Sequence, residues 1–304
     1  MSGAGKNLNL SKAKSEKNDE YFTRIEDIEA ELSHYTEFIH GKRILCNCND
    51  IPGTSFFDYF VSKFNETGIQ SVTGVGYSEH GNGMKYVFDG NSIISSTLSG
   101  SGGFETNEGI GLIHDCDLVI TNPPFSRLTE YIDTLVTEGA RFIIVGNINA
   151  ATNKIILDYI KDGKIWLGSG YNHLSMWFGI PENYQKCGKS LYVDESGKRF
   201  WKVCGTVWYT NINSDFRHRE IDLRCSVNNT KYEKFDNIDA INVTRYDKIP
   251  YDYDGLIGVP ISFLDKYCPE QFEIVGNEDT FGLYKGRCYL NGKRMYSRIF
   301  IRRK

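Results

Sequence analysis

Asp117-Leu118-Val119-Ile120-Thr121-Asn122-Pro123-Pro124-Phe125 is the stretch that decides the fold. Residues 118–120 are short, branched and apolar without alternation, which predicts a buried strand of a parallel sheet. The prolines end this strand, because neither offers an N–H and each fixes its own φ angle. A residue before a proline is held extended. The turn therefore holds Asn122 at the carboxyl end of a strand, where open α/β sheets bind ligands.

The turn presents two neutral hydrogen-bond acceptors, the Asn122 amide oxygen and the Pro123 carbonyl. They suit an exocyclic amine such as N6 of adenine, because accepting both N–H bonds draws lone-pair density back onto the nitrogen. Phe125 adds a flat face on which a base can stack. A sulfonium methyl donor would supply the electrophile without a metal ion. The alternative is a plain strand-to-loop turn, since Asn-Pro and Pro-Pro often mark turns.

Strands and helices alternate on both sides of this turn. The predicted strands cover residues 43–46, 71–75, 141–145 and 164–167, and the predicted helices cover residues 25–32, 54–64, 128–136 and 155–160. Two later aromatic segments, residues 175–179 and 205–211, also have strand character. Alternation at these lengths predicts an α/β fold, a parallel sheet with helices on both faces.

Length and composition limit the possible classes of protein. The 304 residues suffice for one large α/β domain and a smaller module, and the sequence has no membrane-length apolar run or signal-peptide pattern. Eight irregularly spaced cysteines indicate thiols of a reducing compartment. The closest pair, Cys46 and Cys48, is too tightly spaced for a usual zinc site, so no metal is expected.

Charge is distributed unevenly along the chain. The net charge of −4 disfavours a nucleic-acid partner, but residues 285–304 contain no acidic residue. Aromatic and apolar residues interleave with the cations there, so the run predicts a folded basic surface that contacts phosphates; a solvated face is the alternative. A second basic cluster, residues 217–219, suits phosphate or base-edge contacts. The expected DNA contacts are Arg217, Arg219, Lys293, Arg294 and Arg298.

Further motifs follow one another in a fixed order. They are Lys17-Asn18-Asp19-Glu20-Tyr21-Phe22-Thr23, residues 121–126, 145–150, 164–168, 251–255 with 258–260, and Asn291-Gly292-Lys293-Arg294. Together they resemble the EcoRI-type adenine-specific DNA methyltransferases from about residue 17 to the end. The resemblance implies a Rossmann-like methyltransferase domain with a smaller C-terminal α+β target-recognition region. It also implies methyl transfer from S-adenosylmethionine to N6 of adenine in double-stranded DNA.

The resemblance further assigns residues to the methyl donor. The chain has a polar loop, residues 47–53, where glycine-rich turns are common, so its side chains would hydrogen-bond to the donor. Gly103 stands where relatives carry an acidic residue, and Glu105 or a backbone group would have to replace that contact. Glu79 is expected at the ribose, with a solvated loop carboxylate as the alternative. The expected donor-binding residues are Tyr21, Phe22, Thr23, Asn47, Asn49, Asp50, Glu79, Phe104 and Asn122.

The expected catalytic residues are Asn122, Pro123, Pro124 and Phe125. Because N6 is paired inside duplex DNA, the nucleotide has to be flipped into the site. Trp208 or Tyr209 would then flank the adenine opposite Phe125, and the alternative is a core role in an antiparallel hairpin.

The expected domains are a disordered tail at residues 1–16, a catalytic domain at 17–214 and a DNA target-recognition region at 215–304. A cytoplasmic location in a prokaryotic or phage-infected cell is expected, with a cognate restriction endonuclease as a partner. Three alternatives stay open: methylation of adenine in RNA, methylation of a glutamine amide, and a catalytically silent DNA-binding module.

Overall fold

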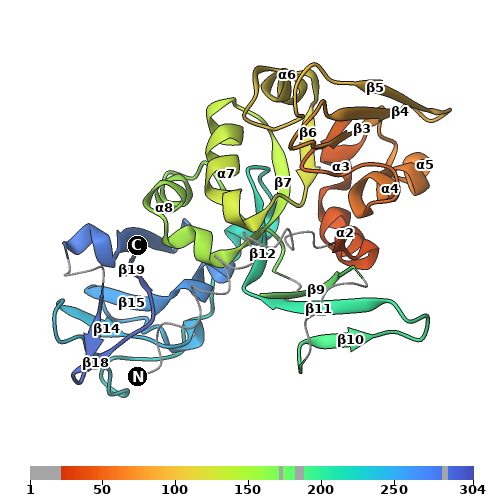
Figure 1. The fold of residues 1–304 in the computed structure, drawn as a ribbon. Coiled ribbons are helices and arrows are strands. Elements are labelled where there is room, and N and C mark those ends of the chain that lie inside the picture. The colour runs from red at the N-terminus through yellow and green to blue at the C-terminus, as the bar shows by residue number, and fades with distance from the viewer. Residues whose placement is uncertain (1–21, 171–173, 182–187, 283–286) are drawn as a thin grey trace. The chain divides into compact units, whose positions relative to one another are not determined.

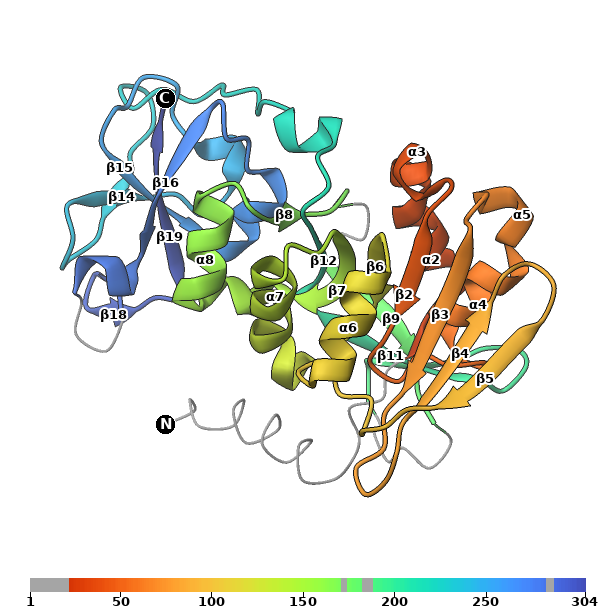
Figure 2. The same cartoon turned by 90° about the horizontal axis from the view of Figure 1, so that it is seen from above.

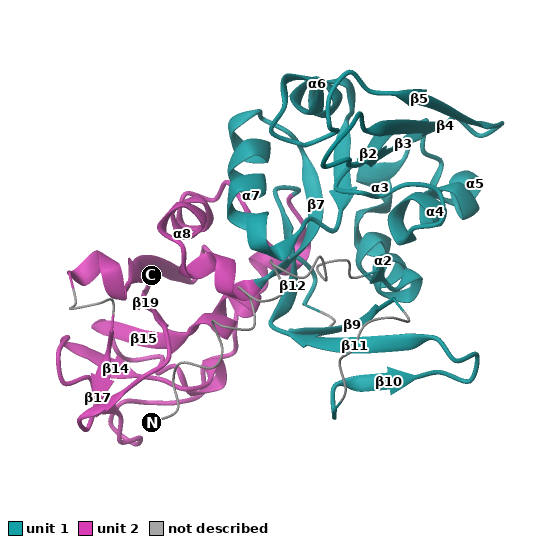
Figure 3. Ribbon diagram, in the orientation of Figure 1, with its two compact units in different colours: residues 1–147, 168–212 teal, residues 148–167, 213–304 magenta. Residues whose placement is uncertain are grey.

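The computed structural model describes residues 22–170, 174–181, 188–282 and 287–304. The expected disordered tail, Tyr21 and Lys285 lie outside these residues. The chain folds into two compact units (Figure 3): unit 1 holds residues 1–147 and 168–212, and unit 2 holds residues 148–167 and 213–304. The sequence-based boundary lies between residues 214 and 215. It assigned residues 148–167 to the catalytic domain, whereas they belong to unit 2.

A large mixed sheet forms the centre of unit 1 (Figure 1), with strands in the order β5-β4-β3-β2-β6-β7-β12. β2, β3, β6 and β7 run parallel, whereas β4, β5 and β12 are antiparallel to their neighbours. The expected parallel sheet is therefore found at the centre, β3-β2-β6-β7, and antiparallel strands flank it on both sides. The strands are β2 (Arg43–Cys46), β3 (Ser71–Gly76), β4 (Met84–Phe88), β5 (Ile93–Thr97), β6 (Leu118–Thr121), β7 (Phe142–Asn147) and β12 (Thr206–Thr210).

The helices of unit 1 follow the apolar spacing of the sequence. In α7 (Leu128–Thr137), buried side chains recur at residues 128, 131, 132 and 135, the period of one helix face. In α4 (Ser55–Ser62), Phe56, Phe57 and Phe60 are buried in the same way. The other helical segments of this unit are α2 (Ile25–Leu32), η1 (Ser33–Tyr35), α3 (Thr36–Ile39), α5 (Phe64–Thr67), α6 (Asn107–Asp115) and η2 (Phe125–Arg127).

The order of the strands reverses between β2 and β6. The chain passes from β2 through α4 to β3 on one side, and from β6 through α7 to β7 on the other. Since crossovers between parallel strands are right-handed, these two connections lie on opposite faces of the sheet. Such a reversal is a topological switch point, and ligands bind at the carboxyl ends of its strands.

A second sheet of unit 1 is wholly antiparallel, in the order β1-β9-β11-β10. Its strands are β1 (Phe22–Thr23), β9 (Ser175–Gly179), β10 (Leu191–Val193) and β11 (Arg199–Cys204). Figure 2 shows the four helices α2, α4, α6 and α7 beside the large sheet from above. None of the helices among the described residues is long and apolar enough to cross a membrane.

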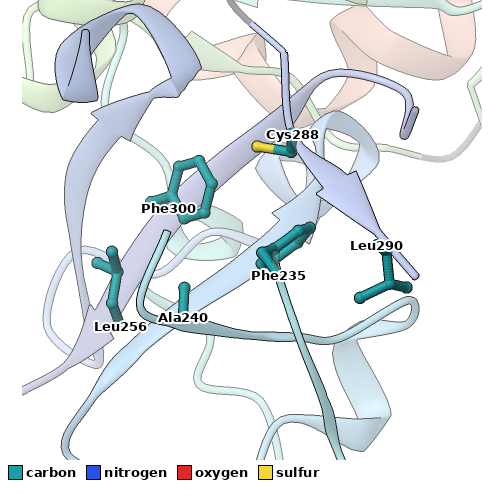
Figure 4. Close-up of a cluster of buried hydrophobic side chains, with 6 residues drawn as sticks. All are labelled: Phe235, Ala240, Leu256, Cys288, Leu290 and Phe300. Atoms are coloured by element: carbon teal, nitrogen blue, oxygen red, sulfur yellow. The ribbon is translucent and has the colours of Figure 1, made fainter. Parts of the chain in front are cut away.

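Unit 2 is built on a five-stranded sheet in the order β13-β14-β15-β19-β16. Its core includes Phe235, Ala240, Leu256, Cys288, Leu290 and Phe300 (Figure 4). The strands are β13 (Glu233–Lys234), β14 (Ala240–Asn242), β15 (Leu256–Pro260), β16 (Phe272–Asn277) and β19 (Arg298–Arg303), and β17 (Tyr289–Leu290) pairs with β18 (Lys293–Arg294). The remaining elements are η3 (Ile148–Thr152), α8 (Lys154–Lys161), β8 (Trp166–Leu167), η4 (Asp215–His218), η5 (Tyr246–Lys248), η6 (Ile261–Lys266) and η7 (Glu278–Phe281).

Candidate active site

Two loops meet at the topological switch point. β2 and β6 pair in parallel, with Leu45 opposite Val119, so the segments that follow them leave the same edge of the sheet. Thr121, the last residue of β6, donates its hydroxyl hydrogen to the backbone carbonyl of Asn47 at 2.5 Å. The prediction that Asn122 lies at the carboxyl end of a buried strand is confirmed.

The polar loop after β2 is held in a strained conformation. Cys48 and Asn49 have φ angles of 66° and 69°, in the left-handed region that costs a non-glycine residue roughly 1–2 kcal/mol. Neighbouring contacts fix this shape. The buried Asn47 side chain accepts a hydrogen bond from the Tyr131 hydroxyl, and Asn49 Oδ1 accepts one from the Tyr77 backbone N–H at 3.3 Å.

Asp50 connects the same loop to helix α4. Its Oδ1 accepts a hydrogen bond from the Phe57 backbone N–H at 3.2 Å and another from the Thr54 hydroxyl. The Phe57 contact satisfies a backbone donor of the first helical turn, the role of a capping carboxylate. Burial raises the pKa of Asp50 from its ordinary value to about 7, while the Thr54 and backbone hydrogen bonds act in the opposite direction.

A pocket of about 530 Å³ opens beside these loops. It draws residues from five segments of unit 1: β1, the loop after β2 with the start of α4, Tyr77 after β3, residues 102–104, and the turn after β6. Among the expected donor residues, the ones that line it are Phe22, Thr23, Asn49, Asp50, Phe104 and Asn122. Burial raises the pKa of Cys48 in its wall to about 12, so this thiol stays neutral near pH 7.

One wall of the pocket is a stack of charged and aromatic groups. Phe104 is 5% exposed; its ring meets Tyr131 edge-on at 4.8 Å, and the Arg127 guanidinium lies 4.4 Å from the ring centre. Arg127 also pairs with Glu105 at 3.1 Å. The Glu105 carboxylate reaches back to Gly103, since a Cβ added there would lie 2.9 Å from Glu105 Oε2. A carboxylate thus stands next to Gly103 although residue 103 has no side chain.

The turn after β6 also lines the pocket. Asn122 and Pro124 line it, and the Pro124 carbonyl accepts the Arg127 backbone N–H at 2.9 Å, which closes a tight turn. Phe125 is half-buried, and its ring meets that of Phe178 edge-on at 6.2 Å.

Two expected donor residues are not in the pocket wall. Asn47 lies beneath the loop, with its side chain bonded to Tyr131. The Glu79 side chain is 57% exposed and lies 3.8 Å from His80, outside the described lining of the pocket. The lining residues that the sequence analysis did not assign to the site include Tyr77, which directly follows β3, and Arg127. The position of Tyr77 at a strand's carboxyl end was the signal that could have found it.

Trp208 and Tyr209 are core residues of β12. They are 1% and 0% exposed, Trp208 packs edge-on against Phe56 at 6.1 Å, and the Tyr209 hydroxyl donates to the Asn147 carbonyl at 3.1 Å. The strand pairs with β7 in the large sheet rather than in a hairpin. In this conformation neither ring has a free face for a base, which favours the core alternative.

The expected DNA-contacting residues of unit 2 differ in exposure. Lys293 and Arg294 are exposed on β18, and Arg219 is exposed after η4. Arg217 lies flat against Trp166, its guanidinium carbon 3.9 Å from the ring centre, and burial lowers its pKa.

Arg298 is not a surface residue. It is 6% exposed and hydrogen-bonds to Asn242 Oδ1 and the Tyr296 carbonyl, both at 3.3 Å. The expectation that Arg298 contacts a phosphate is therefore wrong in this structure. The physical reason is that Arg298 begins β19, which lies between β15 and β16 in the sheet.

The sequence of the chain is similar to those of known methyltransferases. The family model described as adenine-specific methyltransferase EcoRI matches residues 9–92 and 79–304. The chain is 37% identical to the Type II methyltransferase M.EcoRI of Escherichia coli, covering 97% of this chain and 96% of the relative. It is 34% identical to M.MgeORF184P of Mycoplasma genitalium and to M.MpnI of Mycoplasma pneumoniae, covering 97% of this chain and 98% of each relative. No solved structure matches it. The chain belongs to the EcoRI family of adenine-specific methyltransferases and is an S-adenosylmethionine-dependent DNA adenine methyltransferase.

Proposed function

We propose that the chain methylates N6 of an adenine flipped out of duplex DNA, at a site that unit 2 recognises. The observation that carries this proposal is that Asn122 and Pro124 belong both to the turn and to the wall of the 530 Å³ pocket. A donor in the pocket and an amine at the turn would therefore lie next to each other. Positioning of this kind can supply much of the rate of a two-substrate reaction.

The pocket has the features that a nucleoside with an amino-acid tail requires. Thr23 Oγ1 is buried and has no hydrogen-bond partner among the described residues, so a polar group of the donor would satisfy it. Phe22 and Tyr77 offer aromatic surface, and Asn49 and Asp50 add polar groups. We assign the amino-acid end to the side of β1 and the loop after β2. The adenine end lies along Gly103 and Phe104, beside the Glu105 carboxylate.

At the turn, the Asn122 amide oxygen and the Pro123 carbonyl accept the two N–H bonds of the target amine. The donor supplies an electrophilic methyl group, and its sulfur keeps the electron pair of the broken S–C bond. The N6 lone pair forms the new N–C bond, and the nitrogen then loses one proton to solvent. Because acceptor dipoles are fixed before the reaction, they stabilise the charge that develops on nitrogen.

Phe125 is the base-stacking residue of this proposal, since it is half-buried beside Asn122. Phe178, which meets Phe125 edge-on, holds that ring in place. Neither Trp208 nor Tyr209 takes part directly, because both are in the core.

Unit 2 supplies the contacts to DNA outside the site. Lys293, Arg294 and Arg219 are exposed cations, and Arg217 is fixed against Trp166. Contacts to phosphate position a protein on the duplex, and contacts to base edges specify the sequence. A restriction endonuclease that cleaves the same unmethylated sequence is the expected functional partner, since the relatives carry the name Type II methyltransferase.

The test compares wild type with Asn122→Ala on duplex DNA and S-adenosylmethionine labelled in its methyl group. Mass spectrometry of the digested DNA should detect N6-methyldeoxyadenosine, and long-read sequencing of DNA from expressing cells should give its sequence context. Asn122→Ala should lower the single-turnover rate by about 10²–10³, whereas most of the donor binding measured by calorimetry should remain, because the rest of the pocket is unchanged. Asn91→Ala, the same substitution in the exposed β4–β5 turn, is the matched control. A near wild-type rate in Asn122→Ala would remove the role assigned to this residue.

A further inference from the structure

The antiparallel sheet β1-β9-β11-β10 has one face made largely of aromatic side chains. The strand registers place Phe22, Gly179, Phe200 and Tyr192 in a single row across the four strands. Trp177 and Lys202, paired with each other, lie two residues further along their strands and therefore on the same face. We call this set the aromatic face: Phe22, Trp177, Tyr192, Phe200 and Lys202.

The opposite face of the sheet packs on the core of unit 1 along β1 and β9. Thr23, Met176 and Phe178 point to that side and are 3%, 1% and 0% exposed. On the aromatic face, by contrast, Phe22 is 38% and Tyr192 52% exposed. A sheet whose inner side already packs on the core does not need aromatic residues on its outer side for stability.

Three rings of this face contact one another: the exposed Tyr192 and the half-buried Trp177 and Phe200. Tyr192 lies 5.9 Å from the ring of Trp177 and 6.0 Å from that of Phe200, and the Tyr192 and Phe200 planes differ by only 33°. Gly179 leaves the row between Phe22 and Phe200 without a side chain. Tyr192, Trp177 and Phe200 therefore form a cluster of rings rather than a set of isolated side chains.

Cations accompany these rings. Lys202 Nζ lies 5.8 Å from the ring centre of Trp177, and the Arg24 guanidinium carbon lies 6.0 Å from that of Phe200. Rings alone would suit any apolar partner. Rings with cations above them suit a polymer that has both flat bases and phosphates, since bases stack on aromatic groups and phosphates pair with cations.

The aromatic face also adjoins the site of methyl transfer. Phe22 belongs to it and lines the 530 Å³ pocket. On the inner side of the same sheet, Phe178 meets Phe125 of the turn after β6. A DNA strand that delivers an adenine to Phe125 therefore passes close to this sheet.

We propose that the aromatic face binds bases of a DNA strand that has lost its pairing next to the target adenine. The inference rests on the proposed function, because flipping a nucleotide is what disrupts pairing locally. Paired bases in a duplex have both faces covered by their neighbours, so only unpaired bases can stack on these rings. The face thus stabilises the opened form of the substrate.

The test measures binding of a short single-stranded oligodeoxynucleotide and of its duplex, without requiring knowledge of the methylated sequence. Tyr192→Ala should weaken binding of the single strand by about 5- to 150-fold, the range for one lost base stack, and leave duplex binding nearly unchanged. Tyr192→Phe should restore single-strand binding. Val193→Ala is the matched control, because Val193 is the next residue of β10, 50% exposed, and points to the other face.

Three outcomes would overturn the inference. They are an equal loss in Tyr192→Ala and Val193→Ala, an equal loss on single strand and duplex, and an equal loss for dextran sulfate, a polyanion without bases. Absence of methylation in wild type would count against the proposed function, whereas methylation with no stacking contribution from Tyr192 would count against this inference alone.

Discussion

Thr121 hydrogen-bonds to the backbone carbonyl of Asn47, and this contact joins the loops that follow β2 and β6. Both residues are buried, at 0% and 3% exposure. The bond spans 74 residues of sequence and fixes the distance between the polar loop and the Asn122 turn.

Thr121→Val should destabilise the protein by about 1–3 kcal/mol, because the Asn47 carbonyl would lose its partner in a buried place. Urea unfolding measures this change. Thr134→Val is the control, since Thr134 also donates to a backbone carbonyl, that of Glu130, but in an exposed setting. If both variants lost the same free energy of unfolding, the buried bond between the two loops would contribute no more to stability than an exposed hydrogen bond does.

Phe125→Ala should weaken both DNA binding and turnover, by roughly 1–3 kcal/mol for a lost base stack. Phe125→Trp should retain more activity, because an indole also offers a flat face. Single-turnover kinetics measures the rate of methyl transfer, and DNA titration measures the affinity. Phe38→Ala is the control, because Phe38 is an exposed phenylalanine of α3. If Phe125→Ala and Phe125→Trp lost DNA affinity and turnover equally, with the fold intact, Phe125 would have a packing role instead.

Asp50 should make stability depend on pH. Its pKa is raised from 3.8 to about 7 in the folded protein, so folding favours the protonated form. Stability contributed by this group is complete below pH 3.8 and is lost progressively as pH rises to about 7. In Asp50→Asn this pH dependence should disappear, and melting curves between pH 4.5 and 8 test it. Parallel pH profiles for wild type and variant would show that Asp50 does not titrate in this range.

The double variant Lys293→Ala, Arg294→Ala should bind duplex DNA more weakly. The slope of log affinity against log salt should also become shallower, by about 0.9 for each phosphate contact that is lost. Target and non-target duplexes should lose affinity about equally, because phosphates carry no sequence information. Arg224→Ala is the control, since Arg224 is exposed but already paired with Asp222 at 2.5 Å.

Arg298→Ala gives the complementary result. Because its side chain is buried and bonded to Asn242 and Tyr296, the variant should lose thermal stability rather than change the salt slope of a correctly folded protein. If Arg298→Ala instead flattened the plot of log DNA affinity against log salt and left thermal stability unchanged, Arg298 would have to be counted among the residues that contact DNA.

Local patterns were sufficient for the elements that surround the site. The expected strand at residues 43–46 is β2, and the expected helix at residues 128–136 is α7 with one further residue. Both have strong local signals, a short apolar run and an apolar period of 3.6 residues. The hairpin β4–β5 had no such signal. β5 is exposed along its whole length and carries Ser95 and Ser96, so no apolar pattern marks it.

Side-chain roles that depend on distant partners were not predictable. Asn47 was assigned to the donor through the family resemblance of its polar loop, yet its side-chain partner Tyr131 is 84 residues away. Arg298 was assigned to the surface because its neighbours are cations, yet the pairing of β19 with two other strands buries it. The spacing of residues in the sequence reveals the periodicity of a helix or strand. It does not reveal the long-range strand pairing that decides which side chain is buried.

The approach of Glu105 to Gly103 has an evolutionary consequence. A carboxylate gained at residue 103 while Glu105 remains would bring two negative charges together, since the first side-chain atom would already be 2.9 Å from Glu105 Oε2. The two positions are therefore epistatic: Gly103→Asp should be harmful in this chain and tolerated after Glu105→Ala. Substitution order is then constrained, and Glu105 has to change first.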